Sequence, residues 1–137
     1  MARRILPDDR DKIKQLFFAK GFKLENEEYL VSFGDSLLQF ANGNLQVRVL
    51  SDRGIEYLEV STLDKPGSWY DLGLLKALML DSDLLLAHPS IEADLIFLFD
   101  RLEEILRMFE PISLEHTKTM LDELKALRAH QMFPDWY

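Results

Sequence analysis

The chain has 137 residues, of which 47% are hydrophobic and 29% charged, with a formal net charge of −8 and no cysteine. This size suits one globular domain with its own core, so we expect residues 1–137 to fold as a single domain without disulfides, thiolate metal sites or a cysteine nucleophile. No stretch reaches the roughly 18 apolar residues of a membrane span, and the N-terminus lacks the apolar core of a signal peptide. We therefore expect a cytoplasmic protein, and the acidic charge disfavours nucleic acid as a partner.

The first expected element is a helix of about 12 residues between Pro7 and Gly21. Proline suits a first turn, the aspartates that follow it lie near the positive end of the helix dipole, and glycine is a natural stop. Ile13, Leu16 and Phe17 follow helical spacing, so we expect them to pack on a sheet. The same region carries basic residues that we interpret as a solvated surface: Arg3, Arg4, Arg10, Lys12 and Lys14.

Four short strands are expected next, at residues 29–33, 36–41, 45–51 and 55–61, after a solvated turn at residues 25–28. The strands are separated by Gly-Asp, Asn-Gly-Asn and Asp-Arg-Gly, which are residue sets that tolerate the backbone of a hairpin turn. Such short connections leave no room for crossover helices, so the sheet should be an antiparallel meander with helices on one face.

The fourth strand carries apolar residues on both faces. Ile55 and Tyr57 point one way, while Leu58 and Val60 point the other. A sheet covered by helices on one side would leave one pair exposed, unless a partner or the aromatic C-terminal tail covers it. This strand is the first indication of an interface, and a homo-oligomer formed through it is one alternative to be tested.

Three helices are expected after the sheet. A short one over residues 72–80 is capped by Asp71, with Leu75, Leu78 and Met79 on its apolar side and Lys76 facing water. Residues 81–90 are interpreted as irregular and partly buried.

The most regular apolar pattern begins after Ser90, which we expect to cap a helix that ends before Pro111. Its stripe recurs at spacings of four and three, through Ile91, Leu95, Leu98, Leu102, Ile105 and Phe109. A last helix from Ser113 to about Ala129 follows a three-residue connection, so the two should form an antiparallel helical hairpin. The predicted fold class is therefore α+β: an N-terminal helix, a four-stranded antiparallel meander, a short helix and a C-terminal helical hairpin.

The sequence contains no recognisable catalytic or cofactor motif. The common nucleotide-binding, hydrolase and zinc-protease signatures are absent. His116 and His130 are fourteen residues apart on one predicted helix, about 21 Å along its axis, so they cannot share a metal within one chain. We assign no catalytic, cofactor-binding or metal-binding residue; a small enzyme that uses a carboxylate or His88 as acid or base is kept as an alternative.

Two groups of residues are candidates for a protein interface. Asp52 and Arg53 form a predicted hairpin tip, and Trp69, Tyr70 and Asp71 follow the last strand; tryptophan, tyrosine and arginine dominate the energetics of many interfaces. Residues 91–110 contain six acidic and two basic residues, a balance of −4. The second group is taken from this acidic helix: Asp100, Glu103 and Glu104.

Residues 33–72 combine a strand meander, DRG in a turn and WYDL at the start of a helix, and an acidic helical hairpin follows. This pattern, which covers about a third of the chain, resembles small uncharacterised bacterial α+β proteins, some of which resemble immunity proteins of polymorphic or contact-dependent toxin systems. The resemblance implies a cytosolic protein that binds one toxin and blocks its active site. An acidic surface would suit a basic partner. We expect a non-enzymatic protein-binding module without a cofactor.

Overall fold

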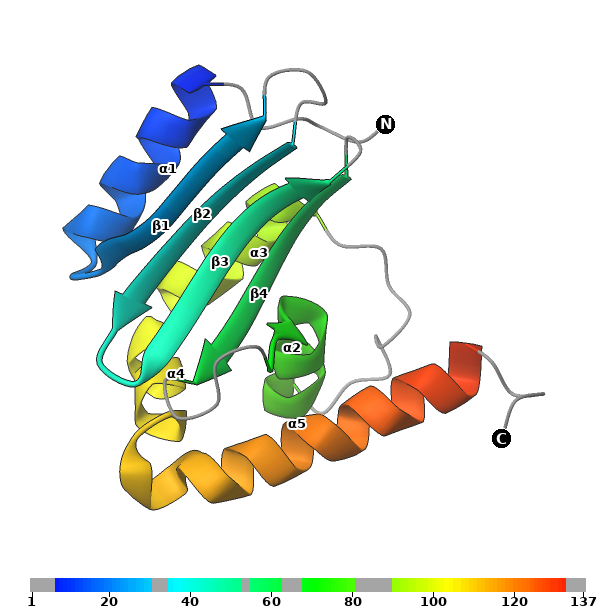
Figure 1. Ribbon diagram of the computed structural model, residues 1–137. Coiled ribbons are helices and arrows are strands. Elements are labelled where there is room, and N and C mark those ends of the chain that lie inside the picture. The colour runs from blue at the N-terminus through cyan, green and yellow to red at the C-terminus, as the bar shows by residue number, and fades with distance from the viewer. Residues whose placement is uncertain (1–6, 31–34, 53–54, 63–67, 81–89, 133–137) are drawn as a thin grey trace.

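In a computed structural model, residues 7–30, 35–52, 55–62, 68–80 and 90–132 are described, and they form an α+β fold (Figure 1). Helix α1 (Pro7–Ala19) precedes a five-stranded sheet, and four helices follow it. The strands are β1 (Lys23–Leu30), β2 (Asp35–Asn42), β3 (Leu45–Asp52), β4 (Ile55–Thr62) and β5 (Tyr70–Asp71). The later helices are α2 (Leu72–Leu80), α3 (Ile91–Asp100), α4 (Leu102–Met108) and α5 (Pro111–Met132). The predicted α+β class, with an N-terminal helix, an antiparallel sheet and helices after it, is confirmed.

The sheet is an antiparallel meander in the order β1-β2-β3-β4-β5. The Asn-Gly-Asn turn between β2 and β3 is as predicted. Its Gly43 has a φ of +59°, a conformation that favours glycine. The prediction for the start of the sheet was wrong, because β1 begins at Lys23 and includes residues 25–28. Charged residues suit this position, since β1 is an edge strand. Residues 31–33 of the predicted first strand lie outside the described residues.

Helices cover one face of the sheet (Figure 1). In β2 and β4 the side chains alternate between buried and partly exposed, and the buried ones include Leu38, Phe40, Leu58 and Val60. These side chains point toward α1 and α3, whereas no described helix lies over the opposite face of β1 to β4. The predicted division of β4 is therefore observed: Leu58 and Val60 face the core, and Ile55, 46% exposed, lies on the open face.

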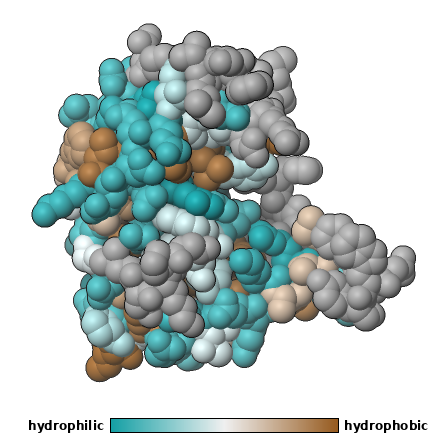
Figure 2. Space-filling model, viewed as in Figure 1, coloured by the Kyte–Doolittle hydropathy of each residue, from teal (hydrophilic) through white to brown (hydrophobic). Residues whose placement is uncertain are grey.

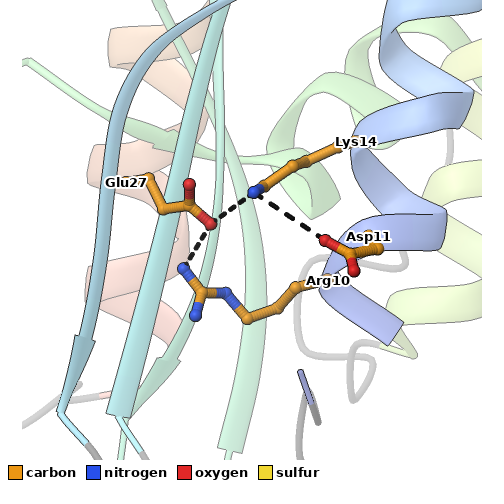
Figure 3. A network of polar contacts seen from close by, with 4 residues as sticks. All are labelled: Arg10, Asp11, Lys14 and Glu27. Atoms are coloured by element: carbon orange, nitrogen blue, oxygen red, sulfur yellow. Dashed lines mark hydrogen bonds and ion pairs between the residues drawn. The ribbon is translucent and has the colours of Figure 1, made fainter. Parts of the chain in front are cut away.

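Helix α1 is attached by an apolar contact and by an ion-pair network. Phe17 is fully buried and stacks on Phe40 with 4.1 Å between the ring centroids, whereas Leu16, predicted to pack on the sheet, is 49% exposed. Arg10 and Lys14 were interpreted as part of a solvated surface, but their side chains lie 2.6 Å and 2.7 Å from the same carboxylate oxygen of Glu27 on β1 (Figure 3). The basic side of α1 thus helps to hold the helix on the sheet.

The predicted long helix after Ser90 is divided in two. Ser90 caps α3 by accepting a hydrogen bond from the backbone N–H of Ala93, as predicted. The helix is interrupted at Arg101, whose φ of −107° and ψ of 17° fall outside helical geometry, and α4 begins directly after it. The core side of the two helices still follows the predicted stripe, with Leu98 and Ile105 fully buried.

The last helix, α5, begins at Pro111 rather than near Ser113. Proline is favoured in the first turn because the N–H that it lacks has no partner inside the helix. Helix α5 follows α4 almost directly and contacts both α4 and α2 as it runs along the bottom of the fold in Figure 1. Within the described residues, no helix is long and apolar enough to cross a membrane.

Candidate functional site

A wide hollow of about 800 Å³ lies along α4 and the end of α3. All three acidic residues proposed from the sequence, Asp100, Glu103 and Glu104, line it. The remaining lining residues are Lys20, Phe99, Arg101, Leu102, Leu106 and Arg107. The hollow thus has a charged rim with three carboxylates and three cations, and an apolar floor.

Two ion pairs on the rim are long and exposed. Arg101 Nη1 lies 3.4 Å from Glu104 Oε2, and Arg107 Nη2 lies 3.8 Å from Glu103 Oε2. The Glu103 side chain is 92% exposed and that of Glu104 is 54% exposed. Exposed pairs of this kind contribute about 0–1 kcal/mol, so these carboxylates can exchange their arginines for cations of another molecule at little cost.

The floor of the hollow is connected to the core. Phe99 is half-buried and meets the fully buried Phe17 edge to face, with 5.0 Å between the ring centroids. Leu106 also packs against the core. The apolar floor is therefore rigidly placed, whereas the charged rim consists of long side chains in solvent.

A second hollow, of about 310 Å³, lies between α4 and α5. Glu104 and Arg107 line both hollows, so α4 separates them as a ridge. The remaining lining residues of this second hollow are Leu78, Met108, Ser113, His116, Thr117 and Met120. Together the two hollows give α4 an uneven surface on which both apolar and charged groups are accessible.

The other candidate residues have structural partners. Tyr70 donates a hydrogen bond of 2.6 Å to Asp122 Oδ1, and Asp71 Oδ2 lies 3.1 Å from Arg128, so β5 holds α5 in place. Asp71 Oδ1 also accepts the backbone N–H of Gly73 at 3.0 Å, which confirms Asp71 as the cap of α2. These residues do not line the hollow along α4. Among the described residues, the structure therefore does not bring the two candidate groups into one site.

Trp69 also belongs to a contact within the fold. The guanidinium of Arg48 lies 4.3 Å from the centroid of the Trp69 ring, and the same arginine is paired with Glu59. Asp52 is the last residue of β3, but its side chain and all of Arg53 lie outside the described residues, as does His88. The predicted hairpin tip thus stays a prediction.

Three cations of the hollow were not proposed from the sequence: Lys20, Arg101 and Arg107. The sequence does contain a spacing that indicates two of them, because Arg101 is three residues before Glu104 and Arg107 is four residues after Glu103. Opposite charges at these spacings meet on a helix surface. The approach of Lys20 depends on the packing of α1, which the spacing of residues does not reveal.

A buried ion pair outside the hollow was also missed. Asp94 lies on the core side of α3 with its side chain 3% exposed, and its Oδ1 is 2.6 Å from Lys76 Nζ. Lys76 was predicted to face water, but it contacts Asp94 because α2 packs against α3. Burial raises the pKa of Asp94 above its ordinary value of 3.8, although the hydrogen bond and charge of Lys76 act in the opposite direction.

No group of three or more histidine, aspartate or glutamate side chains among the described residues could hold a metal ion. No family model matches the chain, and neither does any curated protein or solved structure. The fold and the hollow therefore define the class: an α+β domain with an antiparallel sheet, helices on one sheet face and a hollow with a charged rim along α4.

Proposed function

We propose that the protein is a non-enzymatic protein-binding module that inhibits a basic partner, in the manner of an immunity protein, and that the hollow along α4 is its main contact surface. The observation that carries the proposal is the position of Asp100, Glu103 and Glu104 around one hollow with an apolar floor. An apolar centre inside a polar rim is the usual composition of a protein interface.

Electrostatics favour a basic partner. The whole chain carries a formal charge of −8, which attracts a basic protein from a distance. At short range, Arg101 and Arg107 can turn away from Glu104 and Glu103, because these pairs are long and exposed. A partner's lysines or arginines would then take their place, and the charged contacts would determine mainly the association rate.

The mechanism is steric occlusion. The hollow is wide and lies on a helical surface whose floor is fixed by the contact of Phe99 with Phe17. A partner that places a convex, basic active-site rim on this surface would lose access to its own substrate. No chemical step by this chain is required.

The experiment is a capture of partners from a host lysate at low salt with the tagged protein, followed by mass spectrometry and by binding kinetics with the purified partner. We expect one stoichiometric basic protein whose association rate falls as salt is raised. The double variant Asp100→Lys/Glu103→Lys should lower that rate at least about tenfold, because it reverses two charges at the contact.

A matched control separates the hollow from the total charge. The variant Glu25→Lys/Glu123→Lys changes the net charge by the same amount at two exposed positions, on β1 and α5, that do not line the hollow. It should keep most of the association rate. Equal losses in both double variants, or an affinity independent of salt and of these charges, would contradict the proposal.

A further inference from the structure

The open face of the sheet carries a row of four side chains that crosses β1, β2, β3 and β4. In the strand register, Glu28 is opposite Leu37, Leu37 is opposite Leu50, and Leu50 is opposite Tyr57. Ile55, two residues before Tyr57, extends the apolar part of the row toward the end of β4. Figure 2 shows this side of the molecule as largely hydrophilic, with a hydrophobic area in its upper half.

A hollow of about 220 Å³ is lined by three members of this row, Glu28, Leu37 and Leu50. Its apolar part is formed by Leu37 and Leu50, and Glu28 and Asp35 supply carboxylates at the end of β1 and the start of β2. Arg48 also lines it, but the charge of this arginine is already compensated within the fold.

The compensation of Arg48 is close and specific. Its Nε and Nη2 lie 2.7 Å and 2.6 Å from Glu59 Oε1, and its guanidinium lies over the Trp69 ring. Glu28, by contrast, is exposed and forms no ion pair with any residue that the structure describes. The hollow therefore has an apolar floor and, at one end, the exposed carboxylate of Glu28, which has no ion-pair partner among the described residues.

We propose that this open face is a second contact surface for the basic partner, and that its hollow receives one arginine side chain of that protein. The aliphatic stem would pack on Leu37 and Leu50 while the guanidinium reaches Glu28, since long basic side chains bury their stems and keep their charged ends near water or a carboxylate. The inference rests on the proposed function for the existence of a basic partner.

Charge complementarity favours this occupant over a second copy of the chain. A symmetric contact through the same row would bring the open faces of two chains together, each of net charge −8 and each with Glu28 at the end of its row. The like net charges of the two chains disfavour such a contact.

The inference is tested on the full-length protein without its partner, by ¹H–¹⁵N NMR titration with blocked arginine (N-acetyl-arginine methylamide). Blocked citrulline, which has nearly the same shape but no charge, is the control probe. We expect saturable shifts at the amides of Leu37 and Leu50, and arginine should bind about three- to fivefold more tightly than citrulline. Glu28→Gln should abolish this preference, whereas Glu25→Gln on the same strand should keep it.

Equal binding of the two probes, or no shifts along the row, would overturn the inference. So would sedimentation that shows a dimer dissociated by Tyr57→Asp, because the face would then belong to a second copy. Nuclear Overhauser contacts between residues 133–137 and Leu37 or Leu50 would assign it to the chain's own C-terminus. Because the probe replaces the partner, each of these results is independent of whether a protein binds the hollow along α4.

Discussion

The ammonium group of Lys76 lies 2.6 Å from a carboxylate oxygen of Asp94, and this ion pair connects α2 to α3. The Asp94 side chain is 3% exposed and that of Lys76 is 26% exposed. Burial raises the pKa of Asp94 in spite of the neighbouring cation, so the carboxylate is less stable in the fold than in water. The pair therefore contributes more to how α2 and α3 are positioned than to the free energy of unfolding.

The first prediction concerns pH. Because the folded-state pKa of Asp94 lies above 3.8, the folded protein takes up a proton at this group before the unfolded chain does. Asp94 thus adds stability as the pH falls from above its raised pKa toward 3.8. The free energy of unfolding of the wild type should rise in this window relative to that of Asp94→Asn. Urea unfolding of both proteins between pH 7 and pH 4 measures the difference, and a difference independent of pH would contradict the assignment.

The second prediction concerns the core stripe of α3 and α4. Ile105 is fully buried, so Ile105→Ala should lower the free energy of unfolding by about 2–5 kcal/mol through lost burial and a cavity. Ile96 on α3 is 63% exposed, and Ile96→Ala should change the free energy of unfolding by no more than about 0.5 kcal/mol. Urea denaturation measures both. Similar losses of stability in the two variants would contradict the assignment of Ile105 to the core and of Ile96 to the surface.

Ile105 illustrates what the sequence could predict. The apolar spacing identified Ile105, the turn residues predicted the sheet meander, and residue type and position predicted the caps Asp71 and Ser90. Each of these depends on local geometry or on one periodic pattern. Leu16 fits the same helical spacing and is nevertheless 49% exposed. Helical spacing predicts which residues form an apolar stripe. How much of that stripe is buried depends on the elements that pack against the helix.

The candidate site was predictable to a smaller extent. Glu103 and Glu104 were identified from charge density, and their approach to a common hollow follows from their place on one short helix. The ion pairs of Glu27 with α1 and of Asp94 with α2 were not predicted. They join residues far apart in the chain, and charge alone does not distinguish a carboxylate that will be paired in the fold from one that stays in water.

The third prediction separates the two roles of Asp71. Its Oδ1 caps α2 through the N–H of Gly73, and its Oδ2 pairs with Arg128 of α5. Asn accepts the capping hydrogen bond about as well as Asp, so Asp71→Asn should lose only the ion pair, at a cost of about 0–1 kcal/mol. Asp71→Ala should lose both, with about 0.5–2 kcal/mol more for the cap.

Unfolding measurements on these two variants and on Arg128→Ala test this division. In the Asp71→Asn background, Arg128→Ala should have little further effect, because its ion-pair partner has already lost its charge. If Asp71→Asn is as destabilising as Asp71→Ala, the cap contributes nothing and the assignment of the two oxygens fails.

The last prediction concerns the attachment of α1. Glu27 accepts from Arg10 at 2.6 Å and also pairs with Lys14, and the Arg10 side chain is only 11% exposed (Figure 3). Removing the carboxylate leaves a largely buried guanidinium without this partner, so Glu27→Gln should lower the free energy of unfolding by about 1.5–3 kcal/mol. The adjacent Glu28 points to the opposite face of β1. Glu28→Gln should therefore change the free energy of unfolding by no more than about 0.5 kcal/mol.

Hydrogen exchange locates the effect of this change. In Glu27→Gln the amides of α1 should lose protection more than those of β3, because α1 is held to the sheet by Phe17 together with this network. A uniform loss of protection would mean that α1 unfolds only with the whole domain. Unchanged stability in Glu27→Gln would show that Arg10 is solvated in the folded protein, and the network would then have no role in attaching the helix.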